Sequence, residues 1–349
     1  MRITTLWLLL LSSCLLFVTA CTDEQPQPPA ASDARALLLV NQGNFSQGNG
    51  SLDLYYTDSL KGVRNAYALQ NGETLGGIVE SVSIEDTSLL IITNVSDKLI
   101  LASARSLEKK WMLQDAGRLT TPRYAAFSPE RIFVSVWGPY ESDWSLKNSS
   151  VAVINRSNGQ LEHSIAVPAG PEGVLLEGDR LWVANSATDT LTIINTTTLE
   201  IARKIKTTAR PSKLLKSANG QIWVLAGSRL FAYNSATYEL LHEYSLPASA
   251  TKWQLVDNTL YFLTQEYSAD WSTTYNALYS LAIGGGHAQP VKILEQDNAR
   301  VFWIDPQQGD IYLGIAAGVE PGTLLRLSAN GTELDTEPAG VIPYQLILR

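Results

Sequence analysis

Residues 171–210 read PEGVLLEGDRLWVANSATDTLTIINTTTLEIARKIKTTAR. Four apolar or alternating segments in this stretch are separated by the short polar sequences GD, SATD and NTTT. Gly, Asp and Asn tolerate the backbone angles of tight turns, so these separators mark turns. No segment shows the 3.6-residue period of an amphipathic helix. The stretch therefore predicts four short strands joined by turns.

The second strand of this unit recurs along the whole chain. Its seven copies are LLLVNQ, LLIITN, RIFVSV, RLWVAN, QIWVLA, LYFLTQ and IYLGIA, at spacings of 38 to 53 residues. Seven units of about 45 residues match the size of a four-stranded propeller blade. The sequence therefore predicts an all-β fold, a seven-bladed β-propeller with four-stranded blades and almost no helix.

The two ends of the repeat region predict how the ring closes. Most units open with a strand that follows Pro or a polar residue, but the first unit, which starts at Leu37, lacks that strand. The chain ends in PYQLIL, residues 343–348, which has the missing pattern. We therefore expect the C-terminal strand to pair into the first blade, because this pairing removes two sheet edges and closes the ring.

The first 20 residues read as a lipoprotein signal peptide. Arg2 supplies the positive end, and Leu6 to Val18 form an apolar stretch that is shorter than the ~20 residues of a membrane span. The sequence VTAC at 18–21 resembles a bacterial lipobox, in which the Cys is lipidated. The alternative is an ordinary signal peptide followed by a chance Cys.

Three segments follow from this interpretation. Residues 1–20 are the signal peptide, residues 21–36 are the lipidated Cys21 with a flexible Pro- and Ala-rich tether, and residues 37–349 are the propeller. Several acyl chains, at about 0.8 kcal/mol per buried methylene, anchor a protein stably to a membrane. Thr22 takes the place of the Asp that directs inner-membrane retention, so we expect a lipid anchor in the outer membrane. Asp23 and Glu24 resemble the surface-export signal of Bacteroidota lipoproteins, which implies exposure at the cell surface.

Composition excludes several classes of function. The chain has 26 Lys and Arg against 34 Asp and Glu, a net charge of −8, so nucleic acid is not expected as a partner. The only cysteines are Cys14 and Cys21, so the propeller has no disulfide, Cys-ligated zinc or thiolate nucleophile. The three histidines lie in separate units, two of them in outermost strands, so no metal site is expected. We therefore expect a protein that is not an enzyme and holds no cofactor.

Two segments of the chain resemble known propellers. LWVANSATDTLTIINTTTLEIARKI, followed by Pro, is similar to the repeats of YncE-like seven-bladed propellers, and VNQGNFSQGNGSLDLYY resembles the N-terminal segment of propeller lipoproteins of Bacteroidota. Among these lipoproteins, the resemblance points to the BtuG-like group. It implies a surface protein that captures cobalamin (vitamin B12), a corrinoid, and passes it to a BtuB-like TonB-dependent transporter. The residues alone do not separate cobalamin from a haem, a siderophore or a glycan.

The candidate ligand site comes from two long connections between second and third strands. Both contain three aromatic residues and share the order Tyr, acidic residue, Trp, and we expect both on the face where ligands of propellers bind. Tyr and Trp offer flat apolar area with a polar tip, so we interpret the two loops as aromatic walls around a bulky ligand; the alternative is that they cap their own blades. Residues at the starts of inner strands would complete the site. The predicted ligand-binding residues are Arg123, Tyr124, Trp137, Tyr140, Trp144, Trp253, Tyr267, Trp271, Tyr275, Trp303 and Tyr344.

Other aromatic residues are assigned to the scaffold. They occupy one repeated position in the second strand, which neighbouring blades cover on both faces, so we expect them to pack between blades. These residues are Phe133, Trp182, Trp223, Tyr261 and Tyr312.

Two alternative functions remain open. The first is a metal-dependent lactonase-type hydrolase, in which Glu80, Glu172, Asn94 and Asn185 would supply oxygen ligands near the axis. The second is a protein-interaction platform in a surface complex, in which the aromatic face would be a binding hot spot.

Overall fold

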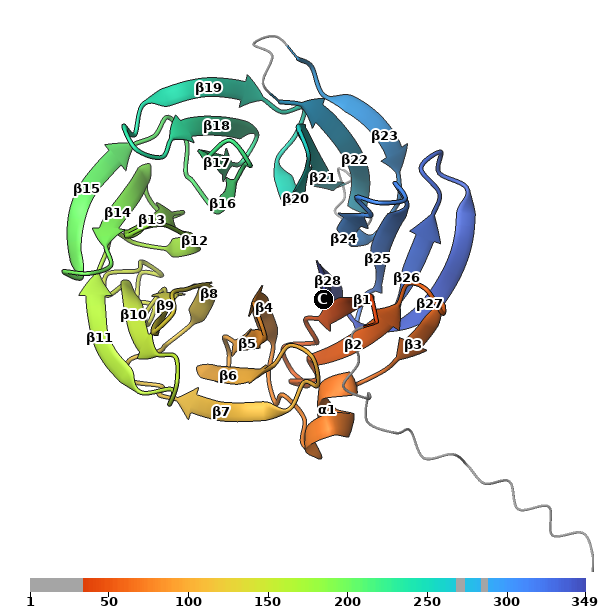
Figure 1. Cartoon of the computed structure of the whole chain (residues 1–349), viewed down its shortest axis with the longest axis horizontal. Helices are drawn as coiled ribbons and strands as arrows, with labels where there is room; N and C mark the ends of the chain where they lie inside the picture. The colour runs from red at the N-terminus through yellow and green to blue at the C-terminus, as the bar shows by residue number, and fades with distance from the viewer. Residues whose placement is uncertain (1–33, 268–273, 284–287) are drawn as a thin grey trace, which may run out of the picture.

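The computed structural model describes residues 34–267, 274–283 and 288–349 of the 349-residue chain. Within these residues, the strands form seven four-stranded antiparallel sheets arranged radially around a central axis (Figure 1). The predicted seven-bladed β-propeller is confirmed. Among the described residues, no helix has the length and apolar character needed to cross a membrane.

Every blade runs from an innermost strand at the axis to an outermost strand at the rim. Blade 1 contains β28 (Pro343–Leu348), β1 (Ala36–Asn41), β2 (Ser51–Tyr56) and β3 (Lys61–Val63). Blade 2 contains β4 (Val79–Glu85), β5 (Ser88–Thr93), β6 (Lys98–Ser103) and β7 (Lys109–Gln114). Blade 3 contains β8 (Pro122–Phe127), β9 (Arg131–Val136), β10 (Ser150–Asn155) and β11 (Leu161–Ala166). Blade 4 contains β12 (Pro171–Glu177), β13 (Arg180–Asn185), β14 (Thr190–Asn195) and β15 (Glu200–Lys206).

The remaining blades follow the same order. Blade 5 contains β16 (Lys213–Lys216), β17 (Gln221–Ala226), β18 (Arg229–Asn234) and β19 (Leu240–Ser245). Blade 6 contains β20 (Ala250–Val256), β21 (Thr259–Tyr267), β22 (Thr274–Ala282) and β23 (Val291–Glu295). Blade 7 contains β24 (Ala299–Ile304), β25 (Ile311–Ala317), β26 (Glu320–Leu327) and β27 (Glu333–Val341).

The core lies between blades rather than at the axis. Second and third strands are apolar on both faces because a neighbouring blade covers each face, whereas the outermost β7 alternates between partly buried and exposed residues. The scaffold prediction is confirmed for the second-strand aromatics: Phe133, Trp182 and Tyr312 have no exposed surface and Trp223 is 1% exposed. Tyr261 is partly buried and packs against the core between blades 6 and 7.

The ring closes as predicted. β28 pairs antiparallel with β1, with Leu37 opposite Leu348 and Leu39 opposite Leu346. The side chain of Gln345 then joins β28 to blade 2: its Oε1 accepts from the Val82 N–H at 2.9 Å, and its Nε2 donates to the Val82 carbonyl at 2.9 Å. The first blade is therefore built from both ends of the chain and bound to its neighbour through one amide.

Two local features depart from the sequence expectation. Blade 1 carries a short helix, α1 (Ala66–Asn71), before the chain enters blade 2, and its Tyr67 is 1% exposed. In blade 6, the two ends of the segment expected to be a long loop continue the hairpin, because β21 extends to Tyr267 and β22 begins at Thr274. Alternation of polar and aromatic residues at these ends also fits a strand, which is why the loop prediction was wrong for them.

Replacing Trp182 by Ala should lower the free energy of unfolding by about 3–5 kcal/mol, because it leaves a cavity between blades 4 and 5. The matched change at Trp144, which is 78% exposed, should alter stability by about 0.5 kcal/mol or less. Urea denaturation followed by intrinsic fluorescence measures both. Equal losses in the two variants would contradict the placement of Trp182 in the core.

Replacing Gln345 by Leu should lower stability by about 1–3 kcal/mol, because both backbone groups of Val82 lose their partner. The control is Gln114→Leu, which removes one exposed hydrogen bond to the Ser96 carbonyl and should change stability by about 0.5 kcal/mol or less. A Gln345 variant as stable as the control would show that this amide does not secure the closed ring.

Candidate functional site

The starts of the seven innermost strands converge around the axis on one face, which we call the axial face. In several blades the second residue of the strand is bulged out of the ladder; Glu80, Arg300 and Tyr344 occupy such positions. A bulge leaves its residue unpaired and redirects its side chain, and at a propeller axis this places polar groups in the central channel. We call the resulting group the axial cluster. It consists of Glu80, Arg123, Tyr124, Glu172, Lys213, Lys252, Arg300 and Tyr344.

Arg123 joins the two carboxylates of the axial cluster. Its guanidinium contacts Glu80 at 2.7 Å and forms a two-point fork with Glu172, with Nε and Nη2 each 2.9 Å from a carboxylate oxygen. Only 13% of the Arg123 side chain is exposed, against 3% for Glu80 and 12% for Glu172. Both carboxylates are therefore committed to one arginine that links blades 2, 3 and 4.

Two lysines lie against two tyrosines in the same cluster. The Lys213 ammonium donates to the Tyr124 hydroxyl and lies 3.5 Å from the centroid of that ring. The Lys252 ammonium lies 3.2 Å from the ring centroid of Tyr344. The first pair joins blades 3 and 5 past blade 4, and the second joins blades 1 and 6 past blade 7. Tyr124 reaches past blade 4, where the corresponding residue is Gly173; a Cβ there would lie 2.9 Å from the Ser212 carbonyl oxygen.

These surroundings shift the pKa values of the cluster. Burial raises the pKa of Glu80, against the effect of Arg123, and raises that of Tyr344 to about 12. Burial lowers the pKa of Lys213 to about 8, although Glu172 and Glu80 oppose the shift. Burial and the neighbouring Lys213 lower the pKa of Lys252 well below its usual value. The Lys213 amine can therefore change charge at mildly basic pH.

Three aromatic residues of blade 3 lead from the cluster to the rim. Arg123 lies 4.2 Å from the Trp137 ring centroid, and Trp137 and Tyr140 meet edge to face at 6.2 Å. Tyr140 in turn contacts Trp144 edge to face at 5.9 Å. We call Trp137, Tyr140 and Trp144 the aromatic arm. Its inner end is partly buried, whereas Tyr140 is 47% and Trp144 78% exposed.

A small turn presents the outer end of the arm. Tyr140 bridges to Leu146, and the Asp143 carboxylate accepts from the Ser145 N–H at 3.0 Å. Trp144 takes a positive φ of 61° at the tip, a conformation that bulky residues rarely adopt. An aromatic ring held outward in a costly conformation is a feature that clusters at functional sites.

The other predicted site residues lie elsewhere. Trp303 is 7% exposed and packs between blades 7 and 1 beneath Arg35, which pairs with Asp305. Trp253 packs with Trp223 against blade 5. Neither indole belongs to the axial cluster. Sequence position identified inner strands correctly, but the alternation of side chains along a strand sends only some of their residues toward the axis.

The second predicted aromatic wall is only partly described. Tyr275 in β22 is 53% exposed, and Tyr267 ends β21. Trp271, like the predicted lipidation site Cys21, lies outside the described residues. Blades 3 and 6 lie on opposite sides of the central axis, so the described part of the second wall, in β21 and β22, does not adjoin the blade that carries the aromatic arm (Figure 1).

Most oxygen atoms of the ligands considered for a hydrolase have protein partners, but Glu80 Oε1 and Asn94 Oδ1 are buried without one. Glu80 and Glu172 bind Arg123, and the Asn94 side chain donates to Glu80 at 2.6 Å. Asn185 is fully buried and bonds the Pro168 carbonyl and Thr192. No group of three or more His, Cys, Asp or Glu side chains arranged for a metal ion occurs in the part of the chain that the structure describes.

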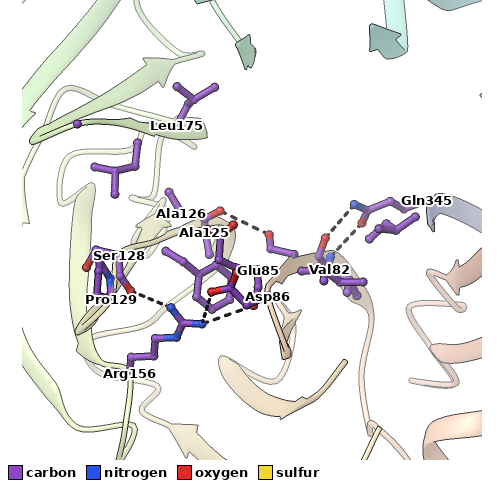
Figure 2. Close-up of a pocket in the computed structure, with 16 residues that line it drawn as sticks. Val82, Glu85, Asp86, Ala125, Ala126, Ser128, Pro129, Arg156, Leu175 and Gln345 are labelled. Carbon is purple, nitrogen blue, oxygen red and sulfur yellow. Dashed lines mark hydrogen bonds and ion pairs between the residues drawn. The ribbon is translucent and has the colours of Figure 1, made fainter. Parts of the chain in front are cut away.

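A separate cavity opens at the other end of the central channel. It has a volume of about 700 Å³ and is lined by the far ends of β4, β8 and β12 with residues of β28 (Figure 2). Arg156 borders it and is already bonded to the Ser128 carbonyl at 3.1 Å and the Ser88 hydroxyl at 3.2 Å. Ser83, Glu85 and Asp86 also line the cavity, so it offers charged and polar groups as well as apolar ones.

The predicted ligand-binding residues do not include three cations of the axial cluster, Lys213, Lys252 and Arg300. Each lies within three residues of the start of an inner strand, in the segments PSKLLK, TKWQLV and ARVFWI. A charged residue just inside an otherwise apolar inner strand is the signal that could have identified them.

Comparison with known proteins supports the fold and leaves the activity open. Residues 35–308 match a family described as a domain of unknown function, DUF5074. Among curated proteins, none matches the sequence. The structure resembles a candidate 6-phosphogluconolactonase of Bacteroides uniformis (TM-score 0.65, 11% identity, covering 90% of this chain and 100% of that one). It is also similar to a candidate 6-phosphogluconolactonase of Bacteroides fragilis (TM-score 0.65, 13% identity, covering 92% of this chain and 99% of that one). A quinonprotein alcohol dehydrogenase-like protein of Bacteroides thetaiotaomicron is similar as well (TM-score 0.63, 12% identity, covering 89% of this chain and 77% of that one). At these identities the likeness shows the propeller fold alone.

Replacing Arg123 by Met should lower stability at pH 7 by about 3–5 kcal/mol, because Glu80 and Glu172 lose the guanidinium that pairs with both of them. Arg123 opposes the rise that burial causes in the pKa of Glu80, so the Glu80 pKa in the folded variant lies still further above that in the unfolded chain. A raised folded pKa favours folding as pH falls, so the deficit relative to wild type should shrink between pH 7 and pH 5. Urea denaturation at both pH values measures it. A deficit that is constant or grows on acidification would contradict the pairing.

Proposed function

The chain belongs to the DUF5074 family, and we propose that it is a binding protein that captures a bulky small molecule on its axial face. The observation that carries this proposal is the continuous path from Arg123 through Trp137 and Tyr140 to the exposed Trp144. It joins a charged centre to an apolar surface, which is how small-molecule sites combine affinity with orientation.

The exposed rings can supply substantial binding free energy. If Tyr140 and Trp144 each lose about 60 Å² of apolar surface to a ligand, the gain is about 3 kcal/mol at about 25 cal/mol per Å². Association opposes this gain, so hydrogen bonds from the axial cluster must supply the remainder. A ligand that spans both regions fits the face better than one confined to either.

Cobalamin is the ligand we propose first. It is large, its corrin ring is fringed with amides, and it has a nucleotide loop, so it can cover the arm and reach the axis together. The resemblance of the N-terminal segment to BtuG-like lipoproteins supports this choice, as does the lipobox at Cys21. On this proposal the protein is lipid-anchored in the outer membrane, faces outward, and passes its ligand to a TonB-dependent transporter.

The engagement of the acidic residues favours binding over hydrolysis. A lactonase-type mechanism would need Glu80 and Glu172 as ligands or bases, and both are already paired with Arg123. We therefore propose no catalytic residue.

Isothermal titration calorimetry with cyanocobalamin tests the proposal. Wild-type protein should bind at one site, and Trp144→Ala should raise the Kd about tenfold, the equivalent of about 60 Å² of lost apolar contact. Its Tm should not change, because the ring is exposed. The control Met112→Ala removes an exposed apolar side chain from the outermost strand of blade 2 and should bind like wild type.

Two results would contradict the proposal that the protein captures cobalamin. No heat of binding together with no retention on a corrinoid resin ends the identification of cobalamin. An unchanged Kd in Trp144→Ala removes the aromatic arm from the site.

A further inference from the structure

Three cations of the axial cluster have no acidic partner. Among the described residues, no carboxylate lies within ion-pair distance of Lys213, Lys252 or Arg300, although most other buried or half-buried arginines are paired. The two carboxylates of the cluster are held by Arg123. Four cations against two carboxylates give the cluster a formal charge of +2 when both lysines are protonated, in a chain whose net charge is −8.

These cations retain hydrogen-bond donors without acceptors. Lys213 donates to Tyr124, whereas Lys252 contacts only the face of Tyr344 among the described residues. The Nε of Arg300 is buried and has no hydrogen-bond partner. An unmet buried donor on a charged group costs about 1–3 kcal/mol or more, and a bound acceptor removes that cost. The free N–H donors therefore need a hydrogen-bond acceptor, and the positive charge of the cluster favours an acceptor that is an anion.

The cations are also reachable. Lys213, Lys252 and Arg300 are each partly exposed although they belong to the innermost region of the ring. Their blades, 5, 6 and 7, are consecutive around the axis, and the bases of β20 and β24 are neighbours (Figure 1). An oxyanion that enters from the axial face can therefore meet them together.

We propose that Lys213, Lys252 and Arg300 form a binding site for the phosphate group of an organic phosphate. This inference rests on the proposed function in one respect: the rest of the same ligand lies over the aromatic arm. Phosphate presents several acceptor oxygens in a tetrahedron, which suits donors that converge from three separate strands. The site requires no metal and involves no covalent step.

Affinity for phosphate should depend on pH. Lys213 faces Tyr124, Arg123, Glu172, Glu80 and Lys252, and the net result is a pKa of about 8. Lys252 faces Lys213, Arg300, Glu80, Glu172 and Tyr344, and its pKa lies well below the usual value for a lysine. An anion binds the protonated amines, so affinity should fall as pH rises from 6.5 to 9, and binding should be accompanied by proton uptake at neutral pH.

The first experiment uses inorganic phosphate and adenosine monophosphate as probes in calorimetric titrations at fixed ionic strength. Wild type should bind both, and Lys252→Gln and Arg300→Gln should each weaken binding at least tenfold. The matched control is Lys216→Gln, a half-exposed lysine of β16 that pairs with Glu177, and it should bind like wild type. Removing a partly exposed cation that has no acidic partner should not unfold the protein, and the wild-type pH series gives a second test that needs no variant.

The second experiment separates this inference from the proposed function. Cyanocobalamin contains a phosphodiester, and dicyanocobinamide keeps the corrin ring without it. Wild type should bind cobalamin more tightly than cobinamide, and Lys252→Gln should remove most of that difference. If both corrinoids bind equally to wild type and to Lys252→Gln, the phosphate site is wrong and the capture proposal stands. If phosphate binds in a Lys252-dependent manner but no corrinoid binds, the phosphate site stands and cobalamin is the wrong ligand. If wild type binds no phosphate probe, or binds it as well as Lys252→Gln does, the site is refuted.

Discussion

The antiparallel pairing of β28 with β1 is the interaction on which the rest of the structure depends. A radial array of sheets leaves an open edge at each end of the chain unless the two ends meet, and here the last six-residue strand becomes the inner strand of the first blade. The Gln345 amide binds that strand to β4, and the Arg35–Asp305 fork binds the start of β1 to blade 7. Each blade then has a neighbouring blade on both of its faces, and the hydrophobic core is formed between adjacent blades.

Ring closure also determines the chemistry at the axis. Once seven inner strands start around one point, their first residues must share a narrow space, and their charges and sizes become interdependent. Arg123 satisfies two carboxylates from neighbouring blades, and Gly173 leaves the room through which Tyr124 reaches Lys213. The three remaining cations are unpaired. Such groups without partners lower the stability of the folded protein unless a ligand supplies the missing partner, and we propose that a ligand does so here.

The repeat made the fold predictable, but the site was predictable only in part. LWVAN-type strands recur because the second strand of every blade is packed between two neighbouring blades. The number of blades, the strand order and the closing role of PYQLIL could therefore be predicted from the sequence. Arg123, Tyr124 and Tyr344 were correctly placed near the axis, since their position follows from the strand start. Trp303 was placed on the wrong side of its strand, because a bulge at Arg300 shifts the alternation that decides which residues face the axis.

The parts of the site that could not be predicted from the sequence depend on contacts between residues of different blades. No pattern along the chain shows that Lys213 lies on Tyr124, 89 residues away, or that Arg123 joins Glu80 to Glu172. Such pairs arise only when the ring brings separate strands together. The long segment of blade 6 was misjudged for a related reason: extra residues can lengthen a hairpin as readily as a loop, and β21 and β22 take the first course.

The most direct test of a ligand site on the axial face is a crystal structure of the protein grown with cyanocobalamin. The account predicts density for the corrin ring over Tyr140 and Trp144, with the phosphate against Lys252 and Arg300. Density in the cavity beside Arg156 at the opposite end of the channel, with the axial face empty, would contradict it.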